Sequence, residues 1–369
     1  RFFGMATIYA EATLAQNYKT VKHGEVTGGP VYYIHAAFKG LFGKILGVVF
    51  AIFLILALGF MGNMVQSNSI STAFSQVFTS RNISIPPFTV GLFLAVVSLF
   101  VFIGGTNRLA AVVEKLVPFM ALVYIAGSLI VIFCNITRLP SAFAQILLGA
   151  FKPSAVLGGA AGVTVKEAIR YGVARGLFSN EAGMGSAPNV AATAFVSHPV
   201  KQGLIQTLGV FTDTLIICSC TAFIILFSGA PLDGSTNGVQ LTQHALNNEI
   251  GSIGGIFVAV ALFFLRLVSI IGNYYYGEAN IRYLTHKRWI VYLYRLLVGG
   301  MVWVGAMSTL DFVWGLADIT MGLMAICNLI AIAFLGKYAF RLLQDYREQK
   351  KSGIKSPVFT KNKMKDIEK

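Results

Sequence analysis

The chain has 369 residues, of which 56% are hydrophobic and only 12% are charged, and its mean hydropathy is +0.70. A soluble domain carries about 25% charged residues, so these values exclude a soluble globular protein and indicate an integral membrane protein. The net charge of +14 does not indicate a nucleic-acid partner, because lysine and arginine gather in the loops between apolar segments and in the C-terminal tail, as the positive-inside rule expects.

The chain opens with RFFGMATIYAEATLAQ, and residues 1–17 have a helical pattern but are too few to cross a bilayer. This stretch is typical of the second half of a transmembrane helix, so we expect the chain to be an N-terminally truncated fragment. We place Glu11 of this helix close to the cytoplasmic interface. A polar loop with turn glycines is predicted over 19–29, and an interfacial helix over 31–38.

Apolar segments of bilayer-spanning length predict eight membrane spans in the rest of the chain. Their approximate bounds are 44–78, 88–105, 116–135, 164–196, 204–228, 252–284, 290–308 and 312–343. An amphipathic helix at the outer interface is predicted over 139–151. The distribution of lysine and arginine places residues 18–43 and the C-terminus in the cytoplasm. We therefore expect a transmembrane domain over 1–346 and a basic cytoplasmic tail over 347–369, which its composition predicts to be disordered.

The second half of the span 44–78 is unusually polar. Asn63, Gln66 and Ser67 are three and four residues apart, so they share one helix face, and Ser71 continues that face. Two interpretations stay open. These side chains either form hydrogen bonds between helices, worth about 0.6–2 kcal/mol each, or line a substrate cavity.

The span 164–196 contains FSNEAGMGSAP over residues 178–188, a sequence that a continuous helix should avoid. Its glycines and its proline loosen the backbone, while its carboxylate, amide and hydroxyls offer polar partners. In hydrocarbon, irregular backbone persists only where protein covers it or where it lines a water-filled cavity. A broken helix in the membrane is therefore a candidate binding site.

Two ionisable residues in later spans are further candidates, because charged groups inside a membrane are costly and mark functional sites. Asp213 lies in the span 204–228, where it serves either a function or a structural pair with a neighbouring helix. Arg266 lies near the centre of the span 252–284 and costs about 2.5–3.5 kcal/mol there unless it is paired or hydrated. Cysteines and histidines show no metal-ligand spacing, so we expect no metal centre and no organic cofactor.

Segments along the whole chain resemble the alanine or glycine:cation symporter family, also called the sodium:alanine symporters. The resembling segments are FGMATIYAEATLA, GGPVYYI, GNMVQSNSIS, EKLVPFMALVYI, VKEAIRYGVARGLFSNEAG, GNYYYGEANIRYL and WGLADITMGLMAICNLIA. The resemblance implies an all-α integral membrane protein with the leucine-transporter-like fold of five plus five helices in inverted repeat. Against that fold the chain lacks the first core helix and most of the second, so we expect the 369-residue fragment by itself to be inactive.

The implied function is uptake of small neutral amino acids such as alanine or glycine across a bacterial cell membrane, with sodium as the coupling ion. By position, the expected substrate-binding residues are Asn63, Gln66, Phe178, Ser179, Asn180, Gly183, Gly185 and Asn273. Glu181 is expected either to hold the break together or to titrate. The sequence makes no prediction of the oligomeric state.

The chain departs from the family where a cation would bind. In this fold the eighth core helix commonly gives two adjacent hydroxyls to sodium, but here the pair is Val268 and Ser269, and Arg266 stands two positions earlier. Our hypothesis is that the guanidinium occupies or repels the cation and weakens sodium dependence. The alternative is sequence drift without functional meaning.

Other functions are compatible with parts of the sequence. A sodium-independent or proton-coupled transporter or exchanger follows if Arg266 replaces the cation. A channel is less favoured, because pores usually come from oligomers of few spans or from repeated filter loops. A membrane enzyme is less favoured, because no nucleophile–base pair or metal cluster is visible in the spans.

Overall fold

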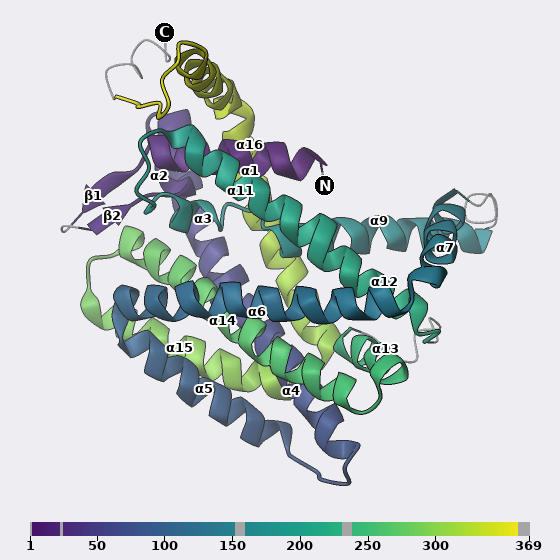
Figure 1. Cartoon of the computed structure of the whole chain (residues 1–369). Coiled ribbons are helices and arrows are strands. Elements are labelled where there is room, and N and C mark those ends of the chain that lie inside the picture. The colour runs from purple at the N-terminus through teal and green to yellow at the C-terminus, as the bar shows by residue number, and fades with distance from the viewer. Residues whose placement is uncertain (1, 23–24, 152–158, 231–237, 361–369) are drawn as a thin grey trace.

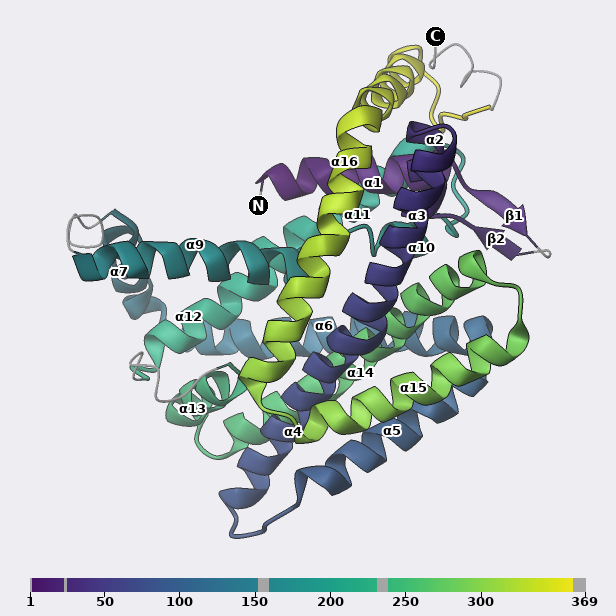
Figure 2. The same cartoon turned by 180° about the vertical axis from the view of Figure 1, so that it is seen from behind.

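Figures 1 and 2 show the computed structural model of the chain, which describes residues 2–22, 25–151, 159–230 and 238–360. The described part is helical apart from one antiparallel hairpin and the connecting loops; η1 and η3 are π-helical and η2 is a 3₁₀ helix. The elements in chain order are α1 (Phe2–Asn17), β1 (Thr20–Lys22), β2 (Glu25–Thr27), α2 (Pro30–Ala37), α3 (Leu41–Leu54), η1 (Ile55–Gly62), α4 (Asn63–Thr79), α5 (Pro87–Ile103), α6 (Gly105–Cys134), η2 (Ile136–Arg138), α7 (Leu139–Phe151), α9 (Gly159–Asn180), α10 (Pro188–Ala191), α11 (Pro199–Phe211), η3 (Thr212–Cys218), α12 (Ser219–Phe227), α13 (Val239–Ile250), α14 (Ile253–Leu284), α15 (Arg288–Met307) and α16 (Leu310–Lys351).

Six helical segments among the described residues are long and apolar enough to cross a membrane, which makes this a multi-pass membrane protein. They are Leu41–Thr79, Ala111–Cys134, Pro199–Phe227, Ile253–Leu284, Arg288–Met307 and Leu310–Lys351. The expected span 88–105 appears as α5, which is apolar but has 17 residues, at the lower limit for crossing a bilayer. The expected span 164–196 is not one apolar helix, because α9 ends at Asn180 and α10 has only 4 residues.

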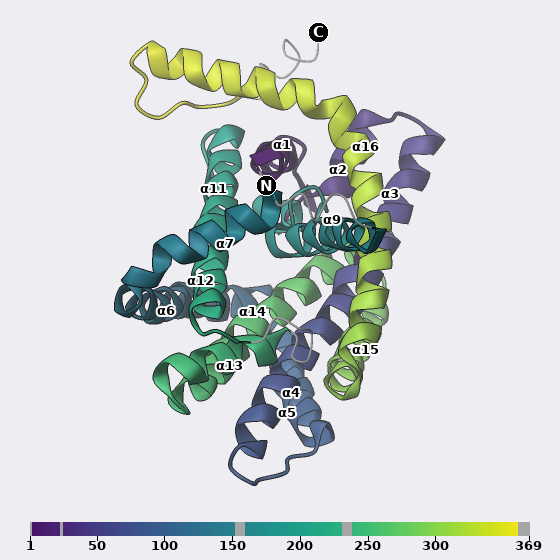
Figure 3. The ribbon, with the colours of Figure 1, turned by 90° about the vertical axis from the view of Figure 1, so that its right-hand side faces the viewer.

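The two longest helical rods lie side by side. One consists of α3, η1 and α4, and the other is α16 (Figure 2). On its far side the first rod packs against α14 and α15, and α5 covers α15. Helices α1 and α11 also lie side by side (Figure 1). Figure 3 shows the last turns of α16 lying across the top of the molecule, over α1 and α11.

A close approach of α15 to α4 depends on Gly305. A Cβ atom at this position would lie 2.4 Å from Met64 Cα and 2.7 Å from Met64 O, and these backbone atoms cannot rotate away. We therefore expect Gly305→Ala to destabilise the protein by about 1–3 kcal/mol through overpacking. Gly300 on the same helix has open space around it, so Gly300→Ala should be neutral or slightly stabilising. Denaturant titration of the two purified variants measures their free energies of unfolding. Equal changes in the two variants would contradict the close approach of α15 to α4 at Gly305.

The predicted polar loop over 19–29 contains an element that the sequence did not reveal. Its residues form the β1–β2 hairpin, in which Val21 pairs with Val26. The predicted interfacial helix over 31–38 and amphipathic helix over 139–151 correspond closely to α2 and α7. The helix over 1–17 is α1.

The prediction of a disordered tail over 347–369 is wrong for residues 347–360. Helix α16 continues to Lys351, and the following segment folds back onto the loop before α11. The Phe359 amide donates to Ser197 O at 2.9 Å, and the Ser197 hydroxyl donates to Pro357 O at 2.8 Å. The Phe359 ring also stands edge-on to His198, at 5.4 Å between centroids. The basic composition of the tail led to the wrong prediction, because the short apolar stretch 357–359 packs on residues that are distant in sequence. Residues 361–369 lie outside the described part.

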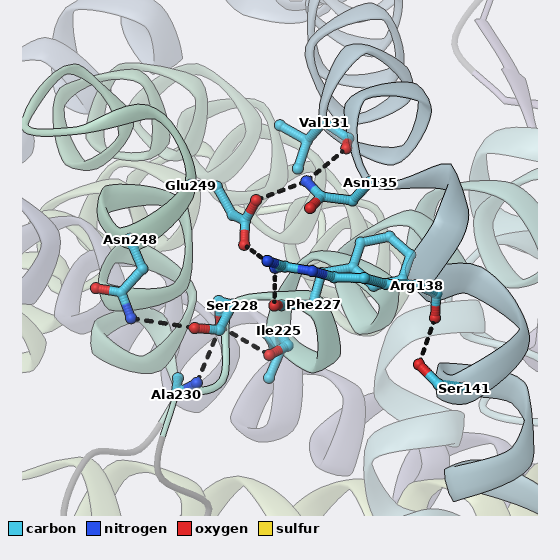
Figure 4. A network of polar contacts seen from close by, with 10 residues as sticks. All are labelled: Val131, Asn135, Arg138, Ser141, Ile225, Phe227, Ser228, Ala230, Asn248 and Glu249. Atoms are coloured by element: carbon cyan, nitrogen blue, oxygen red, sulfur yellow. Dashed lines mark hydrogen bonds and ion pairs between the residues drawn. The ribbon is translucent and has the colours of Figure 1, made fainter.

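A polar network fastens the ends of α6, α12 and α13 to η2 (Figure 4). Arg138 Nη1 donates to Phe227 O at 3.0 Å and lies 3.4 Å from Glu249 Oε1. Asn135 Nδ2 donates to the other oxygen of Glu249 at 2.6 Å. The network closes helix ends whose last carbonyls have no partner inside the helix.

Candidate functional site

The helix is interrupted within the stretch where the sequence predicted a break. Between α9 and α10 the backbone adopts positive φ at Glu181 (52°), Gly183 (90°) and Gly185 (81°). Positive φ is readily adopted by glycine but costs energy in a residue with a Cβ atom, and such strain is concentrated at functional sites. Gly185 is further restricted, because a Cβ atom there would lie 2.8 Å from the ring of Phe50. The break is therefore a defined structure that this sequence specifies.

The freed backbone groups of the break are held by Glu11 of α1. Glu11 accepts hydrogen bonds from the Gly183 amide at 2.9 Å, from the Gly185 amide at 3.0 Å and from Asn328 Nδ2. Asn328, on α16, also donates to Gly183 O at 2.9 Å and accepts from the Tyr33 hydroxyl at 2.5 Å. One carboxylate thus gives two backbone amides the partners that an unbroken helix would have supplied.

The expected position of Glu11 near the cytoplasmic interface stays a prediction, but its side chain is not free at a surface. Its side chain is 0% exposed and lies against the break. A carboxylate in an apolar helix is expensive unless protein surrounds it and satisfies its hydrogen bonds. The rule that singled out Asp213 would also have identified Glu11. Asn328 gave no comparable signal in the sequence.

Gly183 and Gly185 were predicted to bind substrate through exposed backbone groups. Their amides are bonded to Glu11, the Gly183 carbonyl accepts from Asn328, and the Gly185 carbonyl accepts from Asn189 Nδ2 at 3.0 Å. In this structure these groups hold the break in shape. A direct role of either glycine in ligand binding stays a prediction.

The chain leaves the break through a much shorter helix than expected. Helix α10 ends at Ala191, and Gln16 Nε2 donates to Ala191 O at 2.6 Å and to Ala194 O at 2.8 Å. Lys19 Nζ donates to Ala194 O at 3.3 Å and to Gln16 Oε1 at 2.7 Å. These side chains take carbonyls that a continuing helix would have used, so the chain turns away after one turn.

The end of α9 is joined to the π-helical segment η3. The Ser179 hydroxyl donates to Asp213 Oδ2 at 2.6 Å, and the Thr214 hydroxyl donates to Asn180 Oδ1 at 2.8 Å. Of the two interpretations of Asp213, this contact fits a structural pair with a hydroxyl of a neighbouring helix. Short π-helical segments occur frequently at functional sites, and η3 places Asp213 and Thr214 against the end of α9.

Glu181 lies inside the break and receives the Ser186 hydroxyl at 2.7 Å. The Tyr276 hydroxyl of α14 also hydrogen-bonds to it. These contacts favour the interpretation that Glu181 holds the break together. They also bring α14 to the break, since Asn280, one turn further along, donates to Asn189 Oδ1 at 3.2 Å.

Phe178 lies in an aromatic and charged cluster between α9 and α16. Its ring is edge-on to Trp314 at 4.8 Å between centroids. The guanidinium of Arg175 lies 3.7 Å above the Trp314 ring and forms an ion pair with Asp318 at 2.6 Å. The cluster packs the end of α9 against α16, and a role of Phe178 in substrate binding stays a prediction.

Gln66 and Arg266 meet between α4 and α14. Arg266 Nη1 donates to Gln66 Oε1 at 2.7 Å, and Gln66 is 4% exposed. Within the described residues no carboxylate forms an ion pair with Arg266. The adjacent Ser269 hydroxyl donates to Leu265 O of its own helix at 3.1 Å, and Val268 offers no oxygen. The structure thus brings a predicted substrate ligand and the unusual arginine together, next to the predicted cation position.

Two predicted ligands carry buried polar atoms that lack a partner. Asn63 Nδ2 donates to Gly59 O at 2.8 Å in the π-helical segment η1, but Asn63 Oδ1 has no hydrogen-bond partner among the described residues. The same holds for Asn273 Nδ2, which faces Gly62: a Cβ atom on that glycine would lie 3.0 Å from it. An unsatisfied buried polar group costs about 1–3 kcal/mol, and a polar ligand or water bound at these atoms would remove that cost.

Comparison with known proteins extends the resemblance over nearly the whole chain. The model of the sodium:alanine symporter family matches residues 1–361. The chain is 46% identical over 363 residues to a probable sodium/glutamine symporter, GlnT, of Bacillus subtilis (strain 168), which covers 98% of this chain and 73% of that protein. It is 47% identical over 357 residues to the amino-acid carrier protein AlsT of the same organism, covering 96% and 73%.

An archaeal relative is more distant. The sodium/alanine symporter AgcS of Methanococcus maripaludis is 38% identical over 363 residues, covering 96% of this chain and 77% of that protein. The family consists of transporters and not of enzymes, as the sequence predicted. From the family match and these identities, the chain belongs to the sodium:alanine symporter family.

Proposed function

We propose that the protein is a secondary active transporter that couples the flow of a cation, sodium in the first place, to the uptake of a small neutral amino acid such as alanine or glycine. The relatives are named as symporters of sodium with alanine or with glutamine, and as an amino-acid carrier. Transport proceeds by alternating access around the break at residues 178–188.

The observation that carries this proposal is the set of buried polar groups that α4 and α14 bring together. An amino acid in its zwitterionic form needs hydrogen-bond donors for its carboxylate and acceptors for its ammonium group. Asn273 Nδ2 and Arg266 are donors, and Asn63 Oδ1 and Gln66 Oε1 are acceptors, all on α4 and α14. We propose that Phe178, Ser179 and Asn180, at the end of α9, contribute to the same site from the broken helix.

For the fold we propose the leucine-transporter-like arrangement of two inverted repeats. In it α9, the break and α10 form the sixth core helix, and α14 forms the eighth. The cytoplasmic position of the C-terminus stays a prediction from the sequence. Broken helices that place backbone ends at mid-membrane are typical of such transporters.

Counterflow of labelled amino acid tests the proposal. The full-length protein, reconstituted in proteoliposomes preloaded with unlabelled alanine, should accumulate labelled alanine transiently, because a carrier exchanges substrate across the membrane. Gln66→Leu should reduce the initial rate by about tenfold or more, since it removes a buried polar contact to substrate. Gln344→Leu, on the exposed end of α16, is the matched control and should leave the rate unchanged. Absence of counterflow with alanine, glycine and glutamine alike would refute the proposal.

A second candidate is a sodium-independent or proton-coupled amino-acid transporter. The contact of Arg266 with Gln66 favours it, because a guanidinium at this position supplies the positive charge that sodium would bring to a substrate carboxylate. In this alternative the substrate class is unchanged and only the coupling differs.

A further inference from the structure

The turn between α14 and α15 lies beside the β1–β2 hairpin (Figures 1 and 2). A cavity of about 620 Å³ opens at this place, lined by residues of both helices and of the hairpin. Helices α14 and α15 both have membrane-spanning length, and only residues 285–287 join them, so the cavity lies at a membrane surface. Trp289 and Tyr292, on the first two turns of α15, are 61% and 60% exposed. Exposed tryptophan and tyrosine at a helix end are typical of the lipid headgroup level.

The cavity has an excess of positive charge. Its charged lining consists of Arg282, Arg288, Arg295 and Glu278, together with His286. The Glu278 carboxylate accepts two hydrogen bonds from Arg282, at 2.9 and 2.6 Å, and one from Arg295 at 3.4 Å. Glu278 is 3% exposed, so this buried carboxylate holds the guanidinium groups of Arg282 and Arg295 in place. One negative charge does not neutralise two positive charges, so the pair keeps a net positive charge.

Arg288 is the lining arginine that nothing in the described chain neutralises. It begins α15, is exposed, and forms no ion pair or hydrogen bond with a described residue. Arginine presents a planar set of donors that matches phosphate oxygens in pairs. Three guanidinium groups around one open cavity therefore provide both the charge and the donors for a phosphate group.

We propose that this cavity binds the phosphate of an anionic phospholipid headgroup. The cavity lies at the membrane surface, which favours a lipid headgroup over a dissolved anion as its ligand. Basic pockets between transmembrane helices are known to hold anionic headgroups. The volume falls within the range of about 300–1,000 Å³ that is common for small-ligand sites. The neighbouring hairpin adds apolar surface, because Val26 lines the cavity and its partner Val21 is 65% exposed. The proposal does not depend on what the protein transports.

Lipid titration with two adjacent variants tests it. The full-length protein in detergent is titrated with short-chain phosphatidylglycerol, and bound lipid is counted by native mass spectrometry. Arg288→Gln should weaken binding by about tenfold, because it removes a charge-assisted contact to phosphate. Lys287, the residue before Arg288, is exposed and does not line the cavity, so Lys287→Gln should change the affinity by less than about twofold. Arg288→Lys should restore part of the affinity through its charge.

Three other results would contradict the proposal. Equal losses in Arg288→Gln and Lys287→Gln would show diffuse attraction to the basic surface instead of a site. Equal binding of phosphatidylcholine would show that the negative charge is not recognised. Displacement of the lipid by inorganic phosphate at matched concentration would assign the cavity to a dissolved anion. Thermal stability of all variants in phosphatidylcholine nanodiscs confirms that each one is folded.

Discussion

Replacing Glu11 by alanine is expected to lower the free energy of unfolding by about 3–5 kcal/mol, because it leaves the buried amides of Gly183 and Gly185 and the side chain of Asn328 without their acceptor. The Glu11 side chain is 0% exposed, so the amides that it leaves unpaired are buried in the protein. The loss should appear as a lower midpoint of thermal or denaturant unfolding in detergent, together with loss of transport.

A variant of nearly the same size separates the effect of side-chain volume from the effect of hydrogen bonding at this site. Glu11→Gln keeps one acceptor oxygen but turns a donor toward backbone amides, so it should recover only part of the stability lost in Glu11→Ala. Glu114→Gln is the matched control, because Glu114 is an exposed glutamate on α6 with no described partner. If Glu11→Ala unfolds at the same midpoint as this control, the break does not depend on Glu11.

Removing Arg266 and restoring a second hydroxyl is expected to strengthen the sodium dependence of transport. A guanidinium about 6 Å from a sodium ion disfavours it by about 3 kcal/mol at an effective dielectric constant of about 20. The double variant Arg266→Ala, Val268→Thr removes this repulsion and gives sodium an oxygen ligand beside Ser269. The sodium concentration for half-maximal alanine uptake by the full-length protein should fall by about tenfold or more.

The single variants assign the effect to charge or to coordination. Val268→Thr alone should have little effect while the guanidinium remains, whereas Arg266→Ala alone should give most of the change. Arg81→Ala, in the exposed loop after α4, controls for general loss of positive charge. Sodium-dependent uptake by the unaltered protein that already equals uptake by the double variant would refute the hypothesis. It would support the alternative that Arg266 and Val268 arose by drift.

Features set by local sequence were predictable. Apolar length gave α1, α2, α7 and six of the spans, since each helix satisfies its own backbone and needs only an apolar surface. Glycines and a proline gave the position of the break. The polar face of α4 directed attention to Gln66, and the cost of a charge in the membrane directed it to Arg266. The structure joins these two by one hydrogen bond.

Features set by contacts between distant segments were not predictable. Glu11 and Gly183 are 172 positions apart, and the pattern of neither segment indicates the other. The four-residue length of α10 depends on Gln16, which lies on α1. The Gln16 side chain donates a hydrogen bond to the carbonyl of Ala191, the last residue of α10. The β1–β2 hairpin has strands of 3 residues each, too short for an alternating pattern to be recognised.

The segment 352–360, which folds back onto the loop before α11, offers a position for a label that reports motion during transport. His198 lies between Tyr346 and Phe359, and its ring bonds to Asp345 at 3.1 Å, so the tail is anchored to the segment that leads from α10 into α11. This segment follows the break by only a few residues. A fluorescent label on a cysteine introduced at Thr360 would therefore sit beside it, outside the substrate path, and would report its displacement as a change in emission during transport.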